Sequence, residues 1–229
     1  TGGIVRYQQV PLVAWWCGVC LFLVPGVGRA NVGPLTSGGQ VVAEPAGIEQ
    51  IFISREVLQL DLRPLADNRP GEINAVYHLE NRDQPRQLDL LFASGGPDIT
   101  EFLATLDDQP LATRPLLDAA IPPAWQPPKT TPGLRGEEPL SYLGFGSRKT
   151  IPLALSVTIP SGTHTLRVQY RAAAAMHRLG QPTVYHQLAY VLAPARSWAG
   201  FGGLDVTIHL PPNWNVACEP EMTRTGDVL

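Results

Sequence analysis

Apolar and polar residues alternate along much of this chain. In residues 56–64, Leu58, Leu60 and Leu62 are separated by polar residues, and a period of two predicts a strand with one buried face. The same alternation predicts strands within residues 73–81, 86–93, 99–113, 150–160, 164–172, 183–193, 203–211 and 214–222. Short strands separated by Gly and Pro, without an amphipathic helix, predict an all-β antiparallel β-sandwich.

Two polar clusters between these strands predict turns. Asp107, Asp108 and Gln109 would close a hairpin within residues 99–113, because such residues tolerate the backbone angles of a tight turn. Residues 160–163, with the sequence Pro-Ser-Gly-Thr, predict a short turn between the strands on either side.

A proline-rich segment divides the strands into two sets. Seven prolines lie between Pro115 and Pro139, which excludes a helix or a central strand there. The segment is either an interdomain linker or a long loop, so one sandwich and two are both open. We predict five parts: a signal peptide or anchor (1–30), a flexible arm (31–46), a first strand region (47–113), the Pro-rich loop or linker (114–149), and a second strand region (150–229) that is expected to be truncated at its end.

The first thirty residues have the pattern of an export signal. From Val10 to Val27 no side chain is charged, Arg6 precedes this stretch, and the small residues Gly28 and Ala30 come before Asn31. These features predict a signal peptide cut before Asn31. The alternative is an uncleaved anchor helix at the short end of what spans a bilayer. Both predict an exported protein, periplasmic, extracellular or on the cell surface, that meets a membrane only through this segment.

Cys17 and Cys20 follow Trp16 in a Cys-x-x-Cys arrangement that imitates a thioredoxin-like site. Within an export signal these thiols would be removed or held in lipid, where the reactive thiolate is disfavoured. The βαβ pattern of such an enzyme is also missing from the sequence. Cys218 alone remains in the exported part, so no internal disulfide is predicted and Cys218 is expected to be a small buried apolar residue.

Composition and charge exclude one class of partner. The chain has 23 Pro and 22 Gly, which suits short strands and many turns, and its formal net charge is −3. Lys129 and Lys149 are the only lysines among 17 basic residues. No dense basic stripe is present, so nucleic acid is not a predicted partner.

Motifs that carry chemistry are missing from the sequence. His-Glu-x-x-His, Gly-x-Ser-x-Gly and Ser-x-x-Lys do not occur. His78 and His209 fall on outward faces of predicted strands and could contribute to a surface metal or sugar site, although solvated histidines are the more common case. The other histidines, among them His164, have no acidic neighbour in the sequence. We therefore predict no catalytic residue, no metal and no cofactor.

Several strand motifs resemble those of a known kind of protein. Residues 189–216, from a tyrosine strand through Pro-Ala-Arg-Ser-Trp and Gly-Phe-Gly-Gly to Val-x-Ile-x-Leu-Pro, are similar to a segment of uncharacterised exported bacterial β-sandwich proteins. Residues 76–81 (VYHLEN) and 164–172 (HTLRVQYRA) resemble tyrosine-bearing strands of the same proteins. Strands of this type also resemble the N-terminal sandwich domains of secreted metallopeptidases. The resemblance implies the fold and export, and it carries over no catalytic residue.

Aromatic residues supply the remaining candidate site. Trp198 and Phe201 are expected to fold over an open end of the sandwich, with Gly200, Gly202 and Gly203 permitting unusual backbone angles. The alternative is a ligand platform that stacks sugar rings, formed by Trp198, Phe201, Trp214 and Trp125.

We predict a non-enzymatic exported module for binding, scaffolding or accessory roles, with an unknown protein or glycan partner. The alternatives are the non-catalytic N-terminal domain of a longer secreted hydrolase, and a carbohydrate-binding module.

Overall fold

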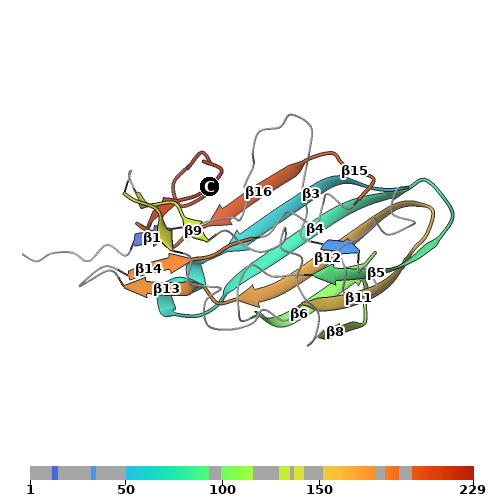
Figure 1. Cartoon of the computed structure of the whole chain (residues 1–229), viewed down its shortest axis with the longest axis horizontal. Helices are drawn as coiled ribbons and strands as arrows, with labels where there is room; N and C mark the ends of the chain where they lie inside the picture. The colour runs from blue at the N-terminus through green and yellow to red at the C-terminus, as the bar shows by residue number, and fades with distance from the viewer. Residues whose placement is uncertain are drawn as a thin grey trace, which may run out of the picture.

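The computed structural model describes residues 12–14, 32–34, 50–92, 99–115, 129–134, 137–141, 152–178, 184–190 and 198–229. Strands make up most of these residues, and a short 3₁₀ helix, η1 (Arg63–Asp67), lies between two of them. The predicted all-β sandwich is confirmed (Figure 1). Within the described part of the chain, no helix is long and apolar enough to cross a membrane.

A large sheet forms one layer of the sandwich. Its strand order is β15-β3-β4-β12-β6-β7, and β16 also pairs with β3. The strands are β3 (Ile51–Asp61), β4 (Gly71–Asn81), β6 (Ile99–Leu106), β7 (Gln109–Pro110), β12 (Gly162–Ala172), β15 (Gly200–Phe201) and β16 (Leu204–His209). β15 and β16 run parallel to β3, whereas the other pairs are antiparallel. The sheet is therefore mixed, because the chain returns to the free edge of β3 by a long crossover.

A four-stranded antiparallel sheet packs against the large one. It contains β2 (Val32–Pro34), β5 (Arg86–Phe92), β11 (Leu153–Ile159) and β8 (Thr113–Pro115) in that order. Inward residues of both sheets share one hydrophobic core. Within it, the Phe92 ring of β5 lies 5.1 Å from Phe102 of β6 and 5.2 Å from Tyr170 of β12, measured between ring centroids. These aromatic contacts join the two layers.

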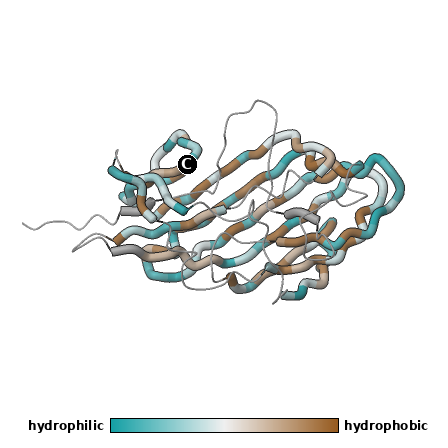
Figure 2. Tube along the Cα trace, in the orientation of Figure 1, coloured by the Kyte–Doolittle hydropathy of each residue, from teal (hydrophilic) through white to brown (hydrophobic). Residues whose placement is uncertain are grey.

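Buried faces follow the alternation read from the sequence. Ile73, Ala75, Tyr77 and Leu79 of β4 are all buried, and Figure 2 shows hydrophobic and hydrophilic residues alternating along the long strands. The predicted hairpin is also present, since β6 and β7 flank Asp107 and Asp108, whose φ angles are 46° and 65°. Two consecutive positive φ angles are the signature of the tight hairpin turn that suits twisted strands.

Strands from both predicted strand regions belong to the same sheets. β12 pairs with β4 on one side and β6 on the other, and β11 pairs with β5. The described strands on either side of the Pro-rich segment thus build one sandwich. Within that segment, β9 (Thr130–Thr131) and β10 (Leu140–Ser141) form a short antiparallel pair.

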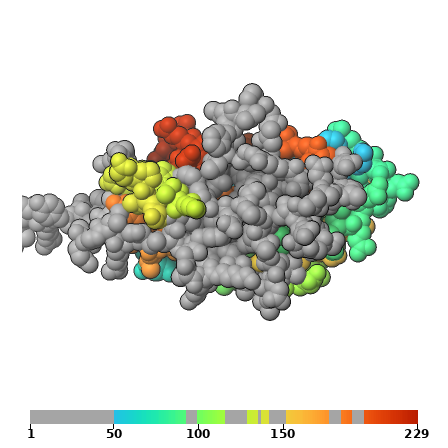
Figure 3. Space-filling model, in the orientation of Figure 1, coloured from blue at the N-terminus to red at the C-terminus, as the bar shows by residue number. Residues whose placement is uncertain are grey.

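The turn at residues 160–163 joins two layers of the sandwich. β11 and β12 lie in different sheets, and so do β4 and β5. Asn81 holds these two crossings together, because its Nδ2 donates to the carbonyl oxygens of Gln84 (3.0 Å), Ile159 (3.0 Å) and Pro160 (2.9 Å). The crossing from β4 to β5 forms the right-hand end of the molecule in Figures 1 and 3.

A further four-stranded sheet has the order β13-β14-β1-β17. Its members are β13 (Ala175–Arg178), β14 (Val184–Gln187), β1 (Leu12–Ala14) and β17 (Asn215–Ala217). β1 comes from the predicted signal or anchor and runs parallel to β14 and β17. These three residues form a strand, and the rest of residues 1–30, on which the expected helix depends, lies outside the described residues. Similarly, β2 attaches three residues of the predicted flexible arm to β5.

The Gly-Phe-Gly-Gly segment lies along the edge of β3. Gly202 N donates to the Ile53 carbonyl (2.8 Å), and Glu56 N donates to the Gly203 carbonyl (2.8 Å). A Cβ on Gly202 would lie 2.1 Å from the Ser54 carbonyl oxygen. The expectation of unusual backbone angles here is wrong, since the positive-φ glycines in the described part of the chain are Gly162 and Gly226. Gly202 is required for close backbone approach instead.

Candidate functional site

A polar groove of about 440 Å³ lies on the large sheet, near the end that carries η1. Five adjacent strands supply its side chains. From β16 to β6 these are His209, then Gln59 and Asp61, then Glu72 and Asn74, then Gln169 and Arg171, and finally Glu101 and Leu103, with Arg63 at the start of η1. They share one surface because alternate residues of each strand point away from the core. We call this surface the sheet groove.

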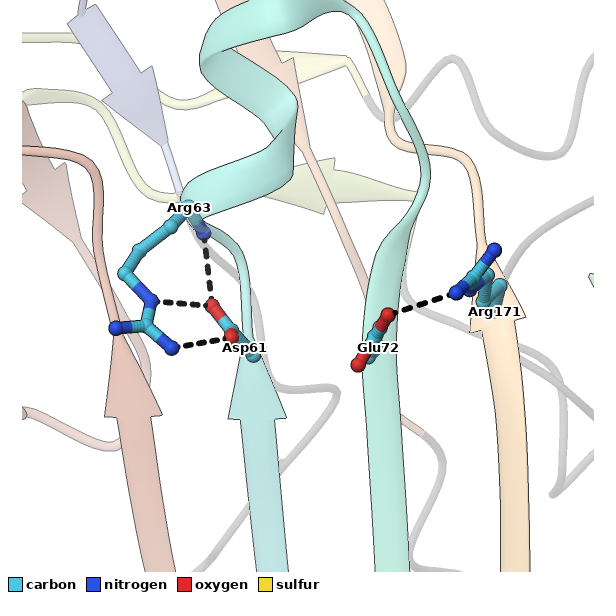
Figure 4. Close-up of polar contacts among 4 residues, drawn as sticks. All are labelled: Asp61, Arg63, Glu72 and Arg171. Atoms are coloured by element: carbon cyan, nitrogen blue, oxygen red, sulfur yellow. Dashed lines mark hydrogen bonds and ion pairs between the residues drawn. The ribbon is translucent and has the colours of Figure 1, made fainter.

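Charged side chains of the sheet groove are paired with one another. Asp61 accepts hydrogen bonds from Arg63 Nε (2.8 Å) and from the Arg63 backbone N–H (3.1 Å). The Arg171 guanidinium donates to Glu72 (3.0 Å) and to Glu101 (2.9 Å). Figure 4 shows the two arginines on either side of Asp61 and Glu72. Each guanidinium therefore has a carboxylate partner within the groove.

These pairs order the site more than they stabilise the protein. The hydrogen bond from Arg63 lowers the pKa of Asp61 and, together with the positive charge of Arg63, outweighs the opposing effect of partial burial. Asp61 is thus a carboxylate at neutral pH. Because the Arg171 pairs are about half exposed to solvent, their contribution to stability is small.

Three amide side chains cross the floor of the groove in register. Asn74 pairs with Gln59 on one side and with Gln169 on the other. Asn74 Nδ2 lies 3.4 Å from Gln59 Oε1, and Asn74 Oδ1 is buried and has no hydrogen-bond partner within the described part of the chain. Each amide presents both a donor and an acceptor. Gln59, which is exposed, and Gln169, which is partly exposed, therefore offer the accessible hydrogen-bonding groups of the row.

A second polar cluster lies inside the sandwich. Glu56 of β3 is fully buried, and its Oε1 accepts a hydrogen bond from the Tyr190 hydroxyl (2.9 Å). The hydroxyls of Tyr190 and Tyr77 are 3.0 Å apart, whereas Glu56 Oε2 has no hydrogen-bond partner among the described residues. The cluster attaches residues 188–190 to the large sheet.

Glu56 is held in its neutral form. Burial raises its pKa from 4.5 to about 8, against the opposing effect of hydrogen bonds from Tyr190 and Tyr77. Burial also raises the pKa of Tyr190 well above its ordinary value. A raised carboxyl pKa is typical of acid catalysts, but Glu56 faces the core rather than the sheet groove. The cluster is accordingly interpreted as structural.

His164 has an acidic partner that the sequence order concealed. Its Nδ1 lies 2.6 Å from Asp107 Oδ2, and Asp107 Oδ1 accepts a hydrogen bond from the Thr165 backbone N–H (2.8 Å). His164 thus has no acidic neighbour in the sequence, but the fold brings Asp107 beside it. These contacts fasten the β6–β7 turn to β12.

The aromatic residues predicted as a ligand platform are largely buried. Trp198 is 6% exposed and Trp214 is 5% exposed, Phe201 is partly buried against the same core, and Trp125 lies outside the described residues. Trp214 stacks on His186 with ring centroids 4.9 Å apart. Sugar stacking needs an exposed ring face, so the burial of both tryptophans speaks against that prediction.

The remaining candidates are dispersed over the molecule. His209 lies in the sheet groove, whereas His78 lies farther along the sheet. Within the described part of the chain, no group of three His, Cys, Asp or Glu side chains could hold a metal ion. Cys218, predicted to be buried, is partly buried against the core, and burial raises the pKa of its thiol.

Sequence reasoning missed most of the sheet groove. Alternation places Asp61, Glu72 and Arg171 on outward faces, but it does not say which strands are neighbours. Glu56 could have been found, because it shares the parity of the inward residues Leu58 and Leu60.

Comparisons with known proteins find fold similarity only. No family model matches the chain, and no curated protein matches it. A "putative nutrient binding protein" from Legionella pneumophila is 14% identical over 80% of this chain and 55% of its own, with a TM-score of 0.46. An M1 zinc metallopeptidase from Deinococcus radiodurans is 12% identical over 70% of this chain and 33% of its own, with a TM-score of 0.31.

The chain spans about half of the length of the Legionella protein. Metallopeptidases are thus among the partly similar structures. At these identities and TM-scores the similarities carry no argument about activity, substrate or partner.

Proposed function

We propose that this chain is a non-catalytic binding module that holds a polar ligand in the sheet groove. The observation that carries this proposal is the row Gln59, Asn74 and Gln169, in which Gln59 is exposed and Gln169 partly exposed. The row lies among two arginines and three carboxylates that are paired with one another. Such a surface offers hydrogen bonds without an unpaired charge. The export signal or anchor expected in residues 1–30 is part of the proposal, and with it we assign the module to the periplasm, the cell surface or the medium.

Sheet register supports the proposal by fixing the groove before any ligand arrives. β4 pairs with β3 and with β12 over most of its length, so the backbone positions of the three amides are set by ladder hydrogen bonds. Arg63 and Arg171 are fixed by the carboxylates that they contact. A preorganised site loses less conformational entropy when it binds.

A ligand screen with matched variants tests the proposal. The full chain is screened by thermal shift against amino acids, short peptides, sugars and oligosaccharides, and every hit is repeated with Gln169→Ala and with Gln87→Ala. Gln87 is an exposed amide on β5 of the other sheet. We expect hits whose stabilisation is lost in Gln169→Ala and kept in Gln87→Ala, and whose ligand is recovered chemically unchanged. Equal shifts in both variants, or conversion of the ligand, would contradict the proposal.

A further inference from the structure

The sheet register extends the amide row to five residues. Thr207 pairs with Gln59, Gln59 with Asn74, Asn74 with Gln169, and Gln169 with Leu103. The row therefore crosses β16, β3, β4, β12 and β6 at right angles to the strands. Neighbouring strands are about 4.8 Å apart, so β16, β3, β4 and β12 each offer one hydrogen-bonding side chain, at a spacing comparable with the length of one sugar ring. β6 offers the apolar Leu103.

Amides suit sugars for a geometric reason. A carboxamide can donate from its NH₂ group and accept at its oxygen at the same time, which matches two adjacent hydroxyls of one sugar ring. Gln59 is exposed, and Asn74 and Gln169 are partly exposed. Asn74 Oδ1 is buried, so the accessible hydrogen-bonding groups are those of Gln59, Gln169 and the exposed part of Asn74. Groups in line on neighbouring strands can meet successive rings of one chain.

Charge in the groove disfavours an ionic ligand. Arg63 is paired with Asp61, and Arg171 is shared between Glu72 and Glu101. An anion would have to displace a carboxylate from one of these guanidinium groups and would meet three carboxylates. A cation would compete with Arg171 for Glu72 and Glu101.

Leu103 adds an apolar contact at the end of the row. Its side chain is 46% exposed, so it offers apolar surface beside the amides. It follows Gln169 directly in the register. The C–H face of a sugar ring can cover such a side chain while its hydroxyls reach the neighbouring amide.

We propose that the ligand of the sheet groove is a neutral oligosaccharide that lies across the strands along Thr207, Gln59, Asn74, Gln169 and Leu103. This inference rests on the proposed function and names its ligand class. The open surface and the repeat of one contact per strand favour a chain of several rings over a single sugar. The residues involved differ entirely from the tryptophans that the sequence suggested as a sugar platform.

Calorimetric titration of the full chain tests the ligand class. The probes are four neutral hexasaccharides (cellohexaose, maltohexaose, xylohexaose and mannohexaose), an anionic oligogalacturonate, a cationic chitosan hexamer and glucose. We expect at least one neutral hexasaccharide to bind more tightly than glucose. Its affinity should stay nearly constant between 50 and 500 mM salt, because screening acts on charged ligands.

Single amide deletions give the expected size of the effect. Gln59→Ala and Gln169→Ala should each weaken binding by up to about tenfold, the loss of an uncharged hydrogen-bonding pair, whereas Gln87→Ala should leave it unchanged. Leu103→Asp should also weaken binding of the neutral chain. Unchanged unfolding midpoints would show that these surface variants keep the fold.

The outcomes separate this inference from the proposed function. Binding of the oligogalacturonate or the chitosan hexamer alone, or of no hexasaccharide at all, would overturn the glycan assignment. If another class in the ligand screen then requires Gln169, the binding function stands with a different ligand. If no compound in either experiment requires Gln169, both proposals fail.

Discussion

Glu56→Gln is the substitution that most directly tests the buried cluster. Glutamine has nearly the same shape as a protonated glutamic acid, and its Oε1 can still accept the hydrogen bond from Tyr190. What the substitution removes is the ability to ionise. The variant should therefore fold like the parent protein and lose one specific component of the pH dependence of stability.

The sign and size of that component follow from the pKa of Glu56. Its folded value, about 8, lies above the ordinary value of 4.5, so the folded chain binds the proton more tightly than the unfolded chain. The stability that Glu56 contributes is complete below pH 4.5 and is lost as the pH rises towards 8. At 1.36 kcal/mol for each pH unit between these values, the loss reaches about 5 kcal/mol.

The assay is urea unfolding of both proteins at pH values from 4.5 to 8.5. We expect similar unfolding free energies at pH 4.5 and an advantage of the Glu56→Gln variant that grows by about 1.4 kcal/mol per pH unit. Taking the difference cancels the other titrating groups, which both proteins share. Glu138→Gln, at an exposed position, reports the general effect of removing one carboxylate.

A flat difference between the two proteins would refute the reasoning. It would mean that Glu56 titrates alike in the folded and unfolded chains, which is incompatible with a neutral acid sealed between Tyr77 and Tyr190. A difference that instead favoured the parent protein at high pH would mean that the buried carboxylate is stabilised by a partner that outweighs its burial.

Three further substitutions test other parts of the fold. Asn81→Ala should lower the unfolding free energy by about 2 to 3 kcal/mol, measured in urea, because three buried or partly buried carbonyls lose their donor. Gly202→Ala should lower the melting temperature by several degrees or more, since its Cβ would meet the Ser54 carbonyl; an unchanged melting temperature would contradict the close approach. Burial raises the pKa of Asp107, but hydrogen bonds from His164 and Thr165 outweigh this effect, and the net pKa is lowered. Asp107→Asn should therefore lower the unfolding free energy by about 1 kcal/mol at pH 7. This loss of unfolding free energy should become smaller as the pH falls below 3.8 and through the pKa of Asp107 in the folded protein. A loss that is independent of pH would contradict an ionised Asp107.

The strands and their buried faces could be predicted because alternation is a local property. Each of Leu60, Ala75, Val168 and Ile208 is buried, and each is identified by neighbours two residues away. The hairpin at Asp107 was predictable for the same reason. Its turn chemistry lies within the turn itself.

Strand neighbours could not be predicted, because they depend on where the chain crosses between layers. Residues 160–163 read equally well as a hairpin turn and as the crossing that the structure shows. The sheet groove depends on that crossing, since it puts Gln169 and Arg171 beside Asn74 and Glu72. Residues about a hundred positions apart thus meet for reasons that no local pattern contains.

The strand motifs that suggested a resemblance have a structural explanation. Tyr77 and Tyr190, each from one of those motifs, meet at Glu56. Asn81, which ends the Tyr-x-Leu-x-Asn motif, links the β4–β5 crossing to the β11–β12 crossing by hydrogen bonds from its side chain. The sequence motifs are defined by the spacing of these residues, whereas in the structure the residues form hydrogen bonds between segments that are far apart in the chain.

The position of β12 in the middle of the large sheet also bears on how the chain folds. β3 and β4 can pair soon after both exist, but the other edge of β4 stays unpaired until residues 162–172 arrive. β6 then depends on the same strand. Contacts between residues so far apart are slow to form, because the chain loses the entropy of a long loop before any favourable contact has formed. The chain is therefore expected to complete its sheet late, because the centre of the sheet waits for β12 and the edge at β3 waits for β15 and β16.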